Sequence, residues 1–177
     1  MKAEVSIRPE RPDDFAAIRA LVTAAFESEA EADLVDAIRR SRQYIAEMAL
    51  VAELGDELVG HVMISGSTLR SDARDRPIVT LAPLAVAPSH QGSGIGSALV
   101  RAATAVAAER GEPLVVLEGN PVYYRRFGFE PSYDHGIEMT PPDWAPREAG
   151  QVLRLEAYDA SLTGLVVYPP AFDVVAE

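Results

Sequence analysis

The sequence contains no cysteine, and this absence limits both its chemistry and its means of stabilisation. Without cysteine the chain has no disulfide framework, no thiolate metal site and no thiol nucleophile, and we expect no bound metal. It also lacks any apolar run close to the roughly 18 residues that cross a membrane. The segment Met1–Ser6 shows no apolar core of a signal peptide. We therefore expect a soluble cytoplasmic protein without a membrane partner.

Positive charge is also scarce. Lys2 is the single lysine, and 16 basic residues stand against 27 acidic ones, for a net charge of −11 and a pI of about 4.7. A chain this acidic repels nucleic-acid phosphates, so we expect no nucleic-acid partner. Long-range attraction would favour a cationic or amine-bearing partner, although solubility alone also accounts for the charge.

A glycine-rich segment stands between a predicted strand and a predicted helix. Residues 86–98 read Val-Ala-Pro-Ser-His-Gln-Gly-Ser-Gly-Ile-Gly-Ser-Ala. The apolar run Ile78–Val86 predicts the strand, and the alanine-rich stretch Ser97–Arg110 predicts the helix. A loop in this position directs free backbone N–H groups at a phosphate, and glycine permits the close approach of the anion. The pattern predicts a site for a phosphorylated cofactor.

The remaining pattern predicts one domain over 1–177, with a core over about 4–130 and C-terminal strands and loops over 131–177. Strands and helices alternate irregularly, which is typical of an α/β fold of the α+β type. Hydrophobic spacing and turn residues predict helices over about 13–26, 31–41 and 122–127, a hairpin over 49–64, strands over 114–117, 151–157 and 165–168, and a loop over 131–150.

Pro83 interrupts the predicted strand Thr80–Val86. Proline cannot donate a hydrogen bond to a sheet, so it belongs on an edge strand or at a bulge. A bulge at this point would splay the strand away from its neighbour. The splay would leave backbone N–H and C=O groups free, and an extended ligand could pair with them.

Two other phosphate-binding loops fit the glycines less well. A nucleoside triphosphate loop needs Lys after its last glycine, but Ser97 follows Gly96 here. A dinucleotide fingerprint would use Gly92, Gly94 and the ribose-binding acid Glu118. However, Ser97 stands where the fingerprint requires Gly or Ala, and only about 60 residues remain downstream, too few for the rest of that fold.

The whole segment resembles a known family. Gln91-Gly92-Ser93-Gly94-Ile95-Gly96 is similar to the Q/R-x-x-G-x-G/A loop of the GNAT superfamily of N-acetyltransferases. Leu84–Pro88 resembles that family's L-x-V-x-P strand, and Tyr124–Phe129 resembles its Y-x-x-x-G-F motif. Segments 119–129 and 168–172 further resemble a bacterial branch of small predicted N-acetyltransferases, so the resemblance covers nearly the whole chain and is weakest over 132–147. It implies a mixed, mostly antiparallel sheet, splayed at its centre, with helices on both faces.

The resemblance implies acetyl-CoA as co-substrate. The N–H groups of the glycine loop would hold the pyrophosphate, and the side chain of Gln91 would add a hydrogen bond. The extended pantetheine arm would pair with the free strand edge. The residues expected to bind the cofactor are Leu84, Ala85, Val86, Gln91, Gly92, Ser93, Gly94, Ile95, Gly96, Ser97 and Asn120.

In this family the acetyl group passes directly to a bound, neutral primary amine of a small molecule or a peptide. The resemblance assigns Tyr124 as the general acid that protonates the CoA thiolate, and a phenol with a pKa of about 10 suits that role. Backbone N–H groups near Val86 would stabilise the tetrahedral oxyanion. The alternative is that Tyr124 only packs against the CoA sulfur.

The general base is not evident from the motifs. Glu118, after the strand that follows the long helix, is the best-placed carboxylate, and His61 is the side chain with the most suitable pKa. Each also has a structural interpretation: Glu118 would pair with an arginine, and His61 would be a core histidine bonded to backbone. A chain of water molecules would also serve as the base.

The acceptor is not specified by any motif. The segment 27–31 shapes the acceptor site in this superfamily, and here it contains Glu27, Glu29 and Glu31. These acids would attract a cationic amine, or they would simply form a solvated helix start. A rival to the enzyme is a non-catalytic module that binds acyl-CoA as a sensor, although Tyr124 favours the enzyme. The apolar segment Leu165–Tyr168 would suit a homodimer interface.

Overall fold

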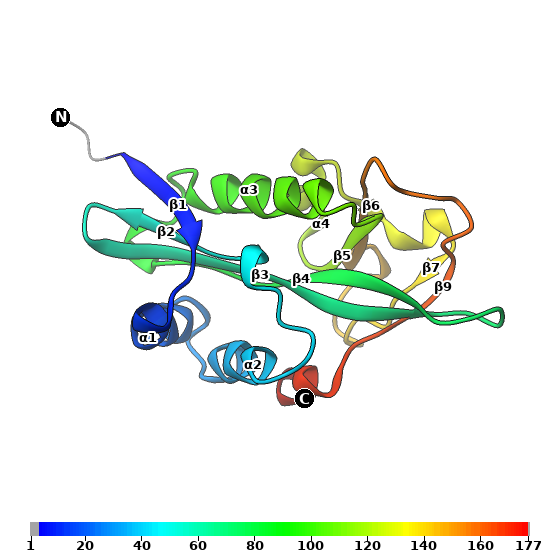
Figure 1. The fold of residues 1–177 in the computed structure, drawn as a ribbon, viewed down its shortest axis with the longest axis horizontal. Coiled ribbons are helices and arrows are strands. Elements are labelled where there is room, and N and C mark those ends of the chain that lie inside the picture. Colours follow the sequence, from blue (N-terminus) through cyan, green and yellow to red (C-terminus); the bar gives the residue numbers. More distant parts are fainter. Residues whose placement is uncertain (1–3, 177) are drawn as a thin grey trace.

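A computed structural model describes residues 4–176 and shows one mixed sheet between two layers of helix (Figure 1). Helix α3 covers one face of the sheet, and α1 and α2 cover the other. Residues 1–3, which include Lys2 and half of the segment inspected for a signal peptide, lie outside the described residues, as does Glu177. Within residues 4–176 no helix is both long and apolar enough to cross a membrane.

The first half of the chain forms the elements that hydrophobic spacing predicts. The helix predicted over 13–26 begins with a 3-10 turn at Pro12–Asp14, where proline suits a first helical position. The hairpin turns at Gly55, which has φ +64°, and its second strand extends well beyond the predicted end. The elements are β1 (Val5–Pro9), α1 (Phe15–Phe26), α2 (Ala30–Arg39), β2 (Ala49–Leu54) and β3 (Glu57–Arg70).

Alternate residues of the central strands face the two helical layers. On β2, Leu50 and Ala52 pack in the same cluster as α3, whereas Ala49 and Val51 pack with α1 and α2. Successive side chains of a strand point to opposite faces of the sheet. A strand that is covered by helices on both faces therefore has apolar residues throughout.

The sheet is mostly antiparallel, as the resemblance implies. Nine strands within residues 4–176 form it, in the order β1-β2-β3-β4-β5-β8-β6, with β9 paired to β3 and β7. Strands β4 and β5 form the central parallel pair, and α3 connects them. These elements are β4 (Arg76–Val86), α3 (Ile95–Glu109) and β5 (Leu114–Glu118).

Strands β4 and β5 separate halfway along β4. They pair only at Val79–Val115 and Thr80–Val116. Just beyond, β4 contains a bulge. Ile64 of β3 pairs with Leu81 and Val62 pairs with Leu84, so two residues of β4, Ala82 and Pro83, lie opposite the single residue Met63. The extra residues include Pro83, which confirms the predicted bulge and places the splay at the centre of the sheet.

The C-terminal part differs most from the sequence prediction. The segment 131–150, expected to be a loop, contains β7 and the second residue of β6, and these short strands pair with β9 and β8. Strand β8 begins at Gly150 and ends at Arg154, three residues before its predicted end, where Arg154 pairs with Leu114, the first residue of β5. The elements are α4 (Pro121–Tyr124), β6 (Glu130–Pro131), β7 (Ile137–Glu138), β8 (Gly150–Arg154) and β9 (Gly164–Val167).

Candidate active site

The glycine loop has the backbone geometry that an anion site needs. Gly92 and Gly94 have φ values of +76° and +90°, and Gly94 is the N-cap of α3. Residues with side chains rarely adopt these angles. Space around both glycines is open, since a Cβ there would meet no heavy atom within 4 Å. A Cβ on Gly96 would instead lie 2.6 Å from the Tyr123 hydroxyl, so the loop and α4 approach closely at that point.

A cavity of about 360 Å³ lies against this loop. Arg126 enters it from the segment after α4, with its guanidinium 4.5 Å above the Tyr123 ring and 3.3 Å from the Ser97 hydroxyl. The guanidinium cation and the N-terminus of α3 line the same cavity, and both favour binding of a phosphate group. The lining residues are Leu84, Val86, His90, Gln91, Gly92, Gly94, Ile95, Gly96, Ser97, Tyr123 and Arg126.

Gln91 is engaged with the protein itself. Its side-chain amide donates to the Val86 carbonyl at 3.1 Å, and the hydroxyl of Ser93 donates to the His90 carbonyl. These bonds tie the loop to the end of β4. The backbone N–H groups that follow the loop are left to face the cavity.

A larger cavity, of about 1020 Å³, opens where β4 and β5 separate. Leu84 lines both cavities, which makes β4 their common wall. Of the predicted site residues, Glu118, Asn120 and Tyr124 line the larger one, whereas Ala85 faces α1 and α2 and is 2% exposed. An extended ligand could therefore run from the glycine loop along Leu84 to Tyr124.

Tyr124 is held rigidly with its hydroxyl available. The side chain of Asn120 accepts a hydrogen bond from the Val122 N–H at 2.9 Å and caps the short helix α4. The Tyr124 ring packs edge-on against Tyr123 and Phe129, at 4.9 and 5.8 Å between centroids. No described residue hydrogen-bonds its hydroxyl. Burial raises the pKa of Tyr124 to about 12, so it is a protonated donor at neutral pH.

Glu118 pairs with a tyrosine rather than an arginine. The Tyr168 hydroxyl donates to the Glu118 carboxylate at 3.0 Å, and the Tyr168 ring stacks on Phe172 at 4.9 Å. Glu118 is open to solvent through the cavity, but the surrounding walls desolvate its carboxylate. This desolvation raises the pKa of Glu118 and outweighs the hydrogen bond, which lowers it.

Comparison with known proteins assigns the family. The sequence model of the acetyltransferase (GNAT) domain matches residues 6–132, which is more than half of the chain. This protein belongs to the GNAT acetyltransferase family. The matched region contains the glycine loop, Leu84, which lines both cavities, and Glu118 and Tyr124 of the larger cavity.

Two curated GNAT relatives come from Escherichia coli K12. The uncharacterized N-acetyltransferase YhbS is 36% identical over 169 residues, covering 94% of this chain and 98% of the relative. The uncharacterized N-acetyltransferase YjhQ is 35% identical over 154 residues, covering 85% and 84%. The match therefore extends beyond the family domain into the C-terminal strands.

Solved GNAT structures share the fold over almost the full length. The crystal structure of YhbS from Escherichia coli in complex with CoA has a TM-score of 0.85 and 35% identity, covering 98% of this chain and 94% of that one. A GNAT acetyltransferase from Brucella melitensis in complex with acetyl-CoA has a TM-score of 0.77 and 31% identity, covering 97% and 99%.

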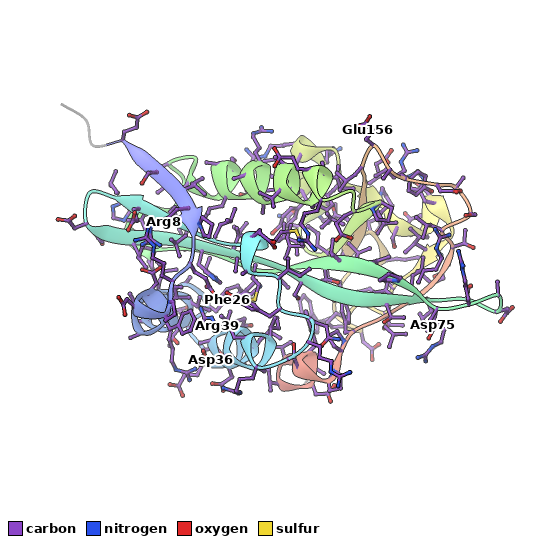
Figure 2. All side chains as sticks on the ribbon, in the orientation of Figure 1. Arg8, Phe26, Asp36, Arg39, Asp75 and Glu156 are labelled. Carbon is purple, nitrogen blue, oxygen red and sulfur yellow. The ribbon has the colours of Figure 1, made fainter. Side chains whose placement is uncertain are left out.

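His61 is kept apart from the GNAT cavities. It is completely buried, and its Nε2 lies 2.9 Å from a Glu10 carboxylate that also binds Arg39 and Tyr44 (Figure 2 shows Arg39 on α2). Burial lowers the pKa of His61, and the residue lines neither cavity. This environment favours a core histidine, but its partner is the Glu10 carboxylate and not the backbone group that the structural interpretation expected. Through Glu10, His61 joins β3 to the end of β1 and to α2. Among the described residues no cluster of His, Asp or Glu could hold a metal ion.

Sequence reasoning missed several walls of the larger cavity. Phe26 enters from the end of α1, Trp144 from the segment between β7 and β8, and Tyr168 and Phe172 from the C-terminus. Tyr168 and Phe172 carry part of the resemblance, but the sequence analysis gives neither of them a role in the site. The available signal was the single tryptophan, Trp144, in an otherwise polar, proline-rich stretch.

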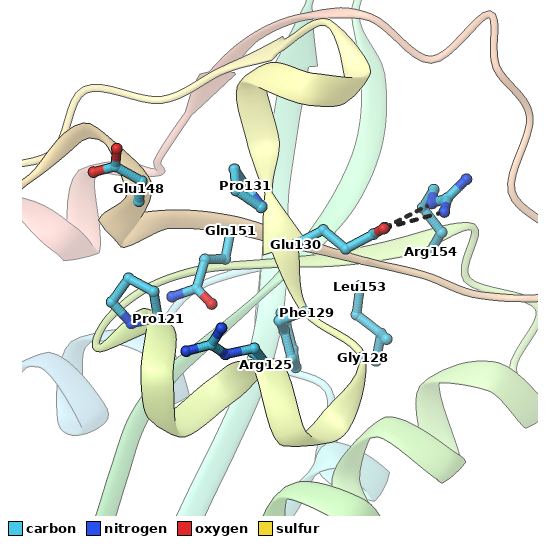
Figure 3. A pocket seen from close by; sticks show the side chains of 10 residues that line it. All are labelled: Pro121, Arg125, Gly128, Phe129, Glu130, Pro131, Glu148, Gln151, Leu153 and Arg154. Carbon is cyan, nitrogen blue, oxygen red and sulfur yellow. Dashed lines mark hydrogen bonds and ion pairs between the residues drawn. The ribbon is translucent and has the colours of Figure 1, made fainter.

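A third cavity, of about 720 Å³, lies on the other side of α4 (Figure 3). Figure 3 shows Gln151 of β8 beside Pro121, the first residue of α4. Gln151 is 1% exposed, and its amide donates to the Gly119 carbonyl at 3.1 Å. Gly119 is packed so tightly that a Cβ would lie 2.6 Å from the Tyr124 ring. Gln151 thus holds the turn that positions Tyr124.

We expect Gln151→Leu to lower kcat about tenfold, because a small displacement of Tyr124 misaligns it with the reacting atoms. The dissociation constant for acetyl-CoA, measured by calorimetry, should stay unchanged, since Gln151 is remote from the glycine loop. Arg154→Gln is the matched control: Arg154 lines the same cavity, and the substitution removes an exposed ion pair with Glu130 at 3.0 Å and a cation–π contact with Tyr158 at 5.6 Å. A Gln151→Leu enzyme that loses stability but keeps its kcat would limit Gln151 to a packing role.

Proposed function

We propose that this protein transfers the acetyl group of acetyl-CoA to a primary amine of a small molecule or a peptide. The observation that carries the proposal is the pair of cavities that meet at Leu84, one walled by the glycine loop and the other by Glu118 and Tyr124. The complexes of the two solved relatives with CoA and acetyl-CoA support this cofactor.

The residues present fit acetyl-CoA. The backbone N–H groups of Gly92 to Ser97 and the guanidinium of Arg126 would hold the pyrophosphate beside the open space at Gly92 and Gly94. The pantetheine arm would follow β4 at Leu84–Val86, where β5 no longer pairs with it. Asn120 would contact the cofactor from the larger cavity, using the amide N–H groups that its helix cap leaves free.

Acetyl-CoA, when bound, supplies an acetyl group activated as a thioester. Glu118 accepts a proton from the incoming ammonium, so that the neutral amine forms a bond to the acetyl carbon. Backbone N–H groups of β4 near Val86 donate to the acetyl oxygen as negative charge develops on it. Tyr124 gives its proton to sulfur as the carbon–sulfur bond breaks. The nitrogen then loses its second proton, which restores Tyr124 through solvent, and solvent removes the proton from Glu118, which leaves the amide and free CoA.

Glu118 makes the reaction depend on pH in a defined direction. Only its ionised form accepts a proton, so kcat/KM falls as pH decreases through the raised pKa of Glu118. Tyr168→Phe removes the hydrogen bond that lowers this pKa. We expect the acidic limb of kcat/KM to move to higher pH in Tyr168→Phe and to disappear in Glu118→Gln, with turnover about 100-fold lower. An unmoved limb in both variants would assign the base to water.

The activity is tested by measuring CoA thiol release from acetyl-CoA over a panel of small amines, polyamines, aminoglycosides and peptide N-termini. Calorimetric titration of acetyl-CoA accompanies it. Binding with turnover on one class supports the enzyme and names its acceptor. Binding without turnover on any amine would favour the sensor module, and absence of acetyl-CoA binding would overturn the proposal.

A further inference from the structure

The two cavities carry opposite charge. The larger one is lined by three acids from three separate elements, Glu31 of α2, Glu118 of β5 and Asp143 of the segment before β8. No Arg, Lys or His is among its described lining residues. The smaller cavity has the reverse character, with the guanidinium of Arg126 and no acid among the residues described there. The site therefore separates an anion-binding end from an acidic end.

Glu31 faces the cavity without a protein partner. Its Oε2 atom is buried, and no residue within 4–176 hydrogen-bonds it. The N-terminus of α2 favours an acid at this position whichever way it points. It supplies no donor to the buried Oε2, which is costly to leave unpaired. Glu31 as a whole is only partly buried, and a rotation of its side chain would bring this oxygen to a ligand in the cavity. The neighbouring Glu29 differs: its side chain is 75% exposed and lies 3.8 Å from Arg19.

The same cavity exposes large apolar side chains. Trp144 is 86% exposed and Phe26 is 39% exposed, and both line it (Figure 2 shows Phe26 at the end of α1). The stacked pair Tyr168 and Phe172 forms another part of the wall. Exposed aromatic surface that gathers in one cavity marks a binding site for an apolar group.

We propose that the acceptor is a cationic amine with an apolar body and no carboxylate or phosphate group. This inference rests on the proposed acetyl transfer. Glu31 would bind the cationic end of the approaching amine or of a second amine, and the aromatic walls would cover the apolar body. A carboxylate or phosphate on the acceptor would face three acids without a counter-ion, so amines that carry one are rejected.

Matched pairs of amines test the proposal. Tryptamine is compared with tryptophan, and phenylalaninamide with phenylalanine, because each pair differs mainly in a carboxylate. Calorimetry with the CoA-loaded protein measures binding without requiring turnover, and acetyl transfer is measured alongside. We expect the carboxylate-free member of each pair to bind about tenfold more tightly and to show the higher kcat/KM.

Glu31→Gln tests the residue that the proposal identifies. We expect KM for tryptamine to rise about tenfold with kcat preserved, while KM for tryptophan rises less, so that discrimination within the pair narrows. Glu29→Gln is the matched control, since it removes an equal charge from the same turn outside the cavity, and it should change neither KM. Equal changes of KM in the two variants would mean that Glu31 acts only through the net charge of the protein and does not bind the acceptor.

The outcomes separate this inference from the function on which it rests. If acetyl-CoA binds and tryptophan binds as tightly as tryptamine, the acceptor inference is overturned while acetyl transfer stands. The same holds if acetyl-CoA binds but no carboxylate-free amine of the panel binds at all. If acetyl-CoA itself fails to bind in calorimetry, both the proposed function and the acceptor inference fall together.

Discussion

Tyr124→Phe is expected to lower kcat about 100-fold or more while it leaves the dissociation constant for acetyl-CoA within about twofold of the wild-type value. The substitution removes one hydroxyl from the larger cavity and keeps the ring that packs on Tyr123 and Phe129. Without that proton donor, the sulfur leaves as a bare thiolate. Steady-state kinetics and calorimetric titration of acetyl-CoA measure the two quantities.

The pH profile adds a second readout for Tyr124. A general acid must be protonated, and burial raises the pKa of Tyr124 to about 12, so activity should persist through the neutral and moderately alkaline range. Tyr158→Phe is the control, because Tyr158 packs in a separate cluster and lines neither cavity of the site. Wild-type turnover in Tyr124→Phe would return this residue to the alternative role, packing against the CoA sulfur.

Gly94→Ala is expected to weaken acetyl-CoA binding about tenfold or more. The residue has φ +90° and caps α3, so alanine strains the loop and turns its N–H groups away from the phosphate site. The added methyl group meets no neighbouring atom, so the effect comes from the backbone angle and not from a clash. Calorimetry gives the affinity, and thermal unfolding gives the stability.

Gly111→Ala provides a closely matched control at the opposite end of the same helix. Gly111 has φ +80°, and a Cβ there also meets no heavy atom within 4 Å. Both variants should therefore lose about 1 kcal/mol of stability, but only Gly94→Ala should lose affinity. Parallel losses of affinity in the two variants would mean that binding follows global stability and that the loop has no direct role.

Most of the cofactor end of the site can be predicted from residues that are close together in the sequence. Gly92, Gly94 and the helix that follows them are contiguous, and glycine at positive φ is a local requirement of the backbone. The bulge at Pro83 is local as well, because a proline inside a strand cannot complete the ladder. Asn120 and Pro121 predicted the start of α4 by the same kind of short-range reasoning.

The acceptor end of the site could not be predicted in this way, because contacts between residues far apart in the chain form it. Glu31, Trp144 and Tyr168 stand far apart in the chain and share one cavity only because α2, the segment before β8 and the C-terminus meet below the splayed strands. No periodicity encodes such a meeting. His61 likewise could not be judged from local sequence. The ordinary pKa of histidine made it a candidate base, but in the fold it is completely buried and pairs with the Glu10 carboxylate just after β1.

The strand, the glycine loop, the helix and the capped turn that carries Tyr124 can be predicted from the amino-acid sequence, and so can the family whose motifs they contain. The structural features among these depend on backbone angles and on hydrogen bonds between residues close in the chain. The folded structure was needed to show which carboxylates line the cavity, that Tyr168 and not an arginine pairs with Glu118, and that Gln151 hydrogen-bonds Gly119. Those choices depend on long-range packing, because burial and the available partners are properties of the assembled fold.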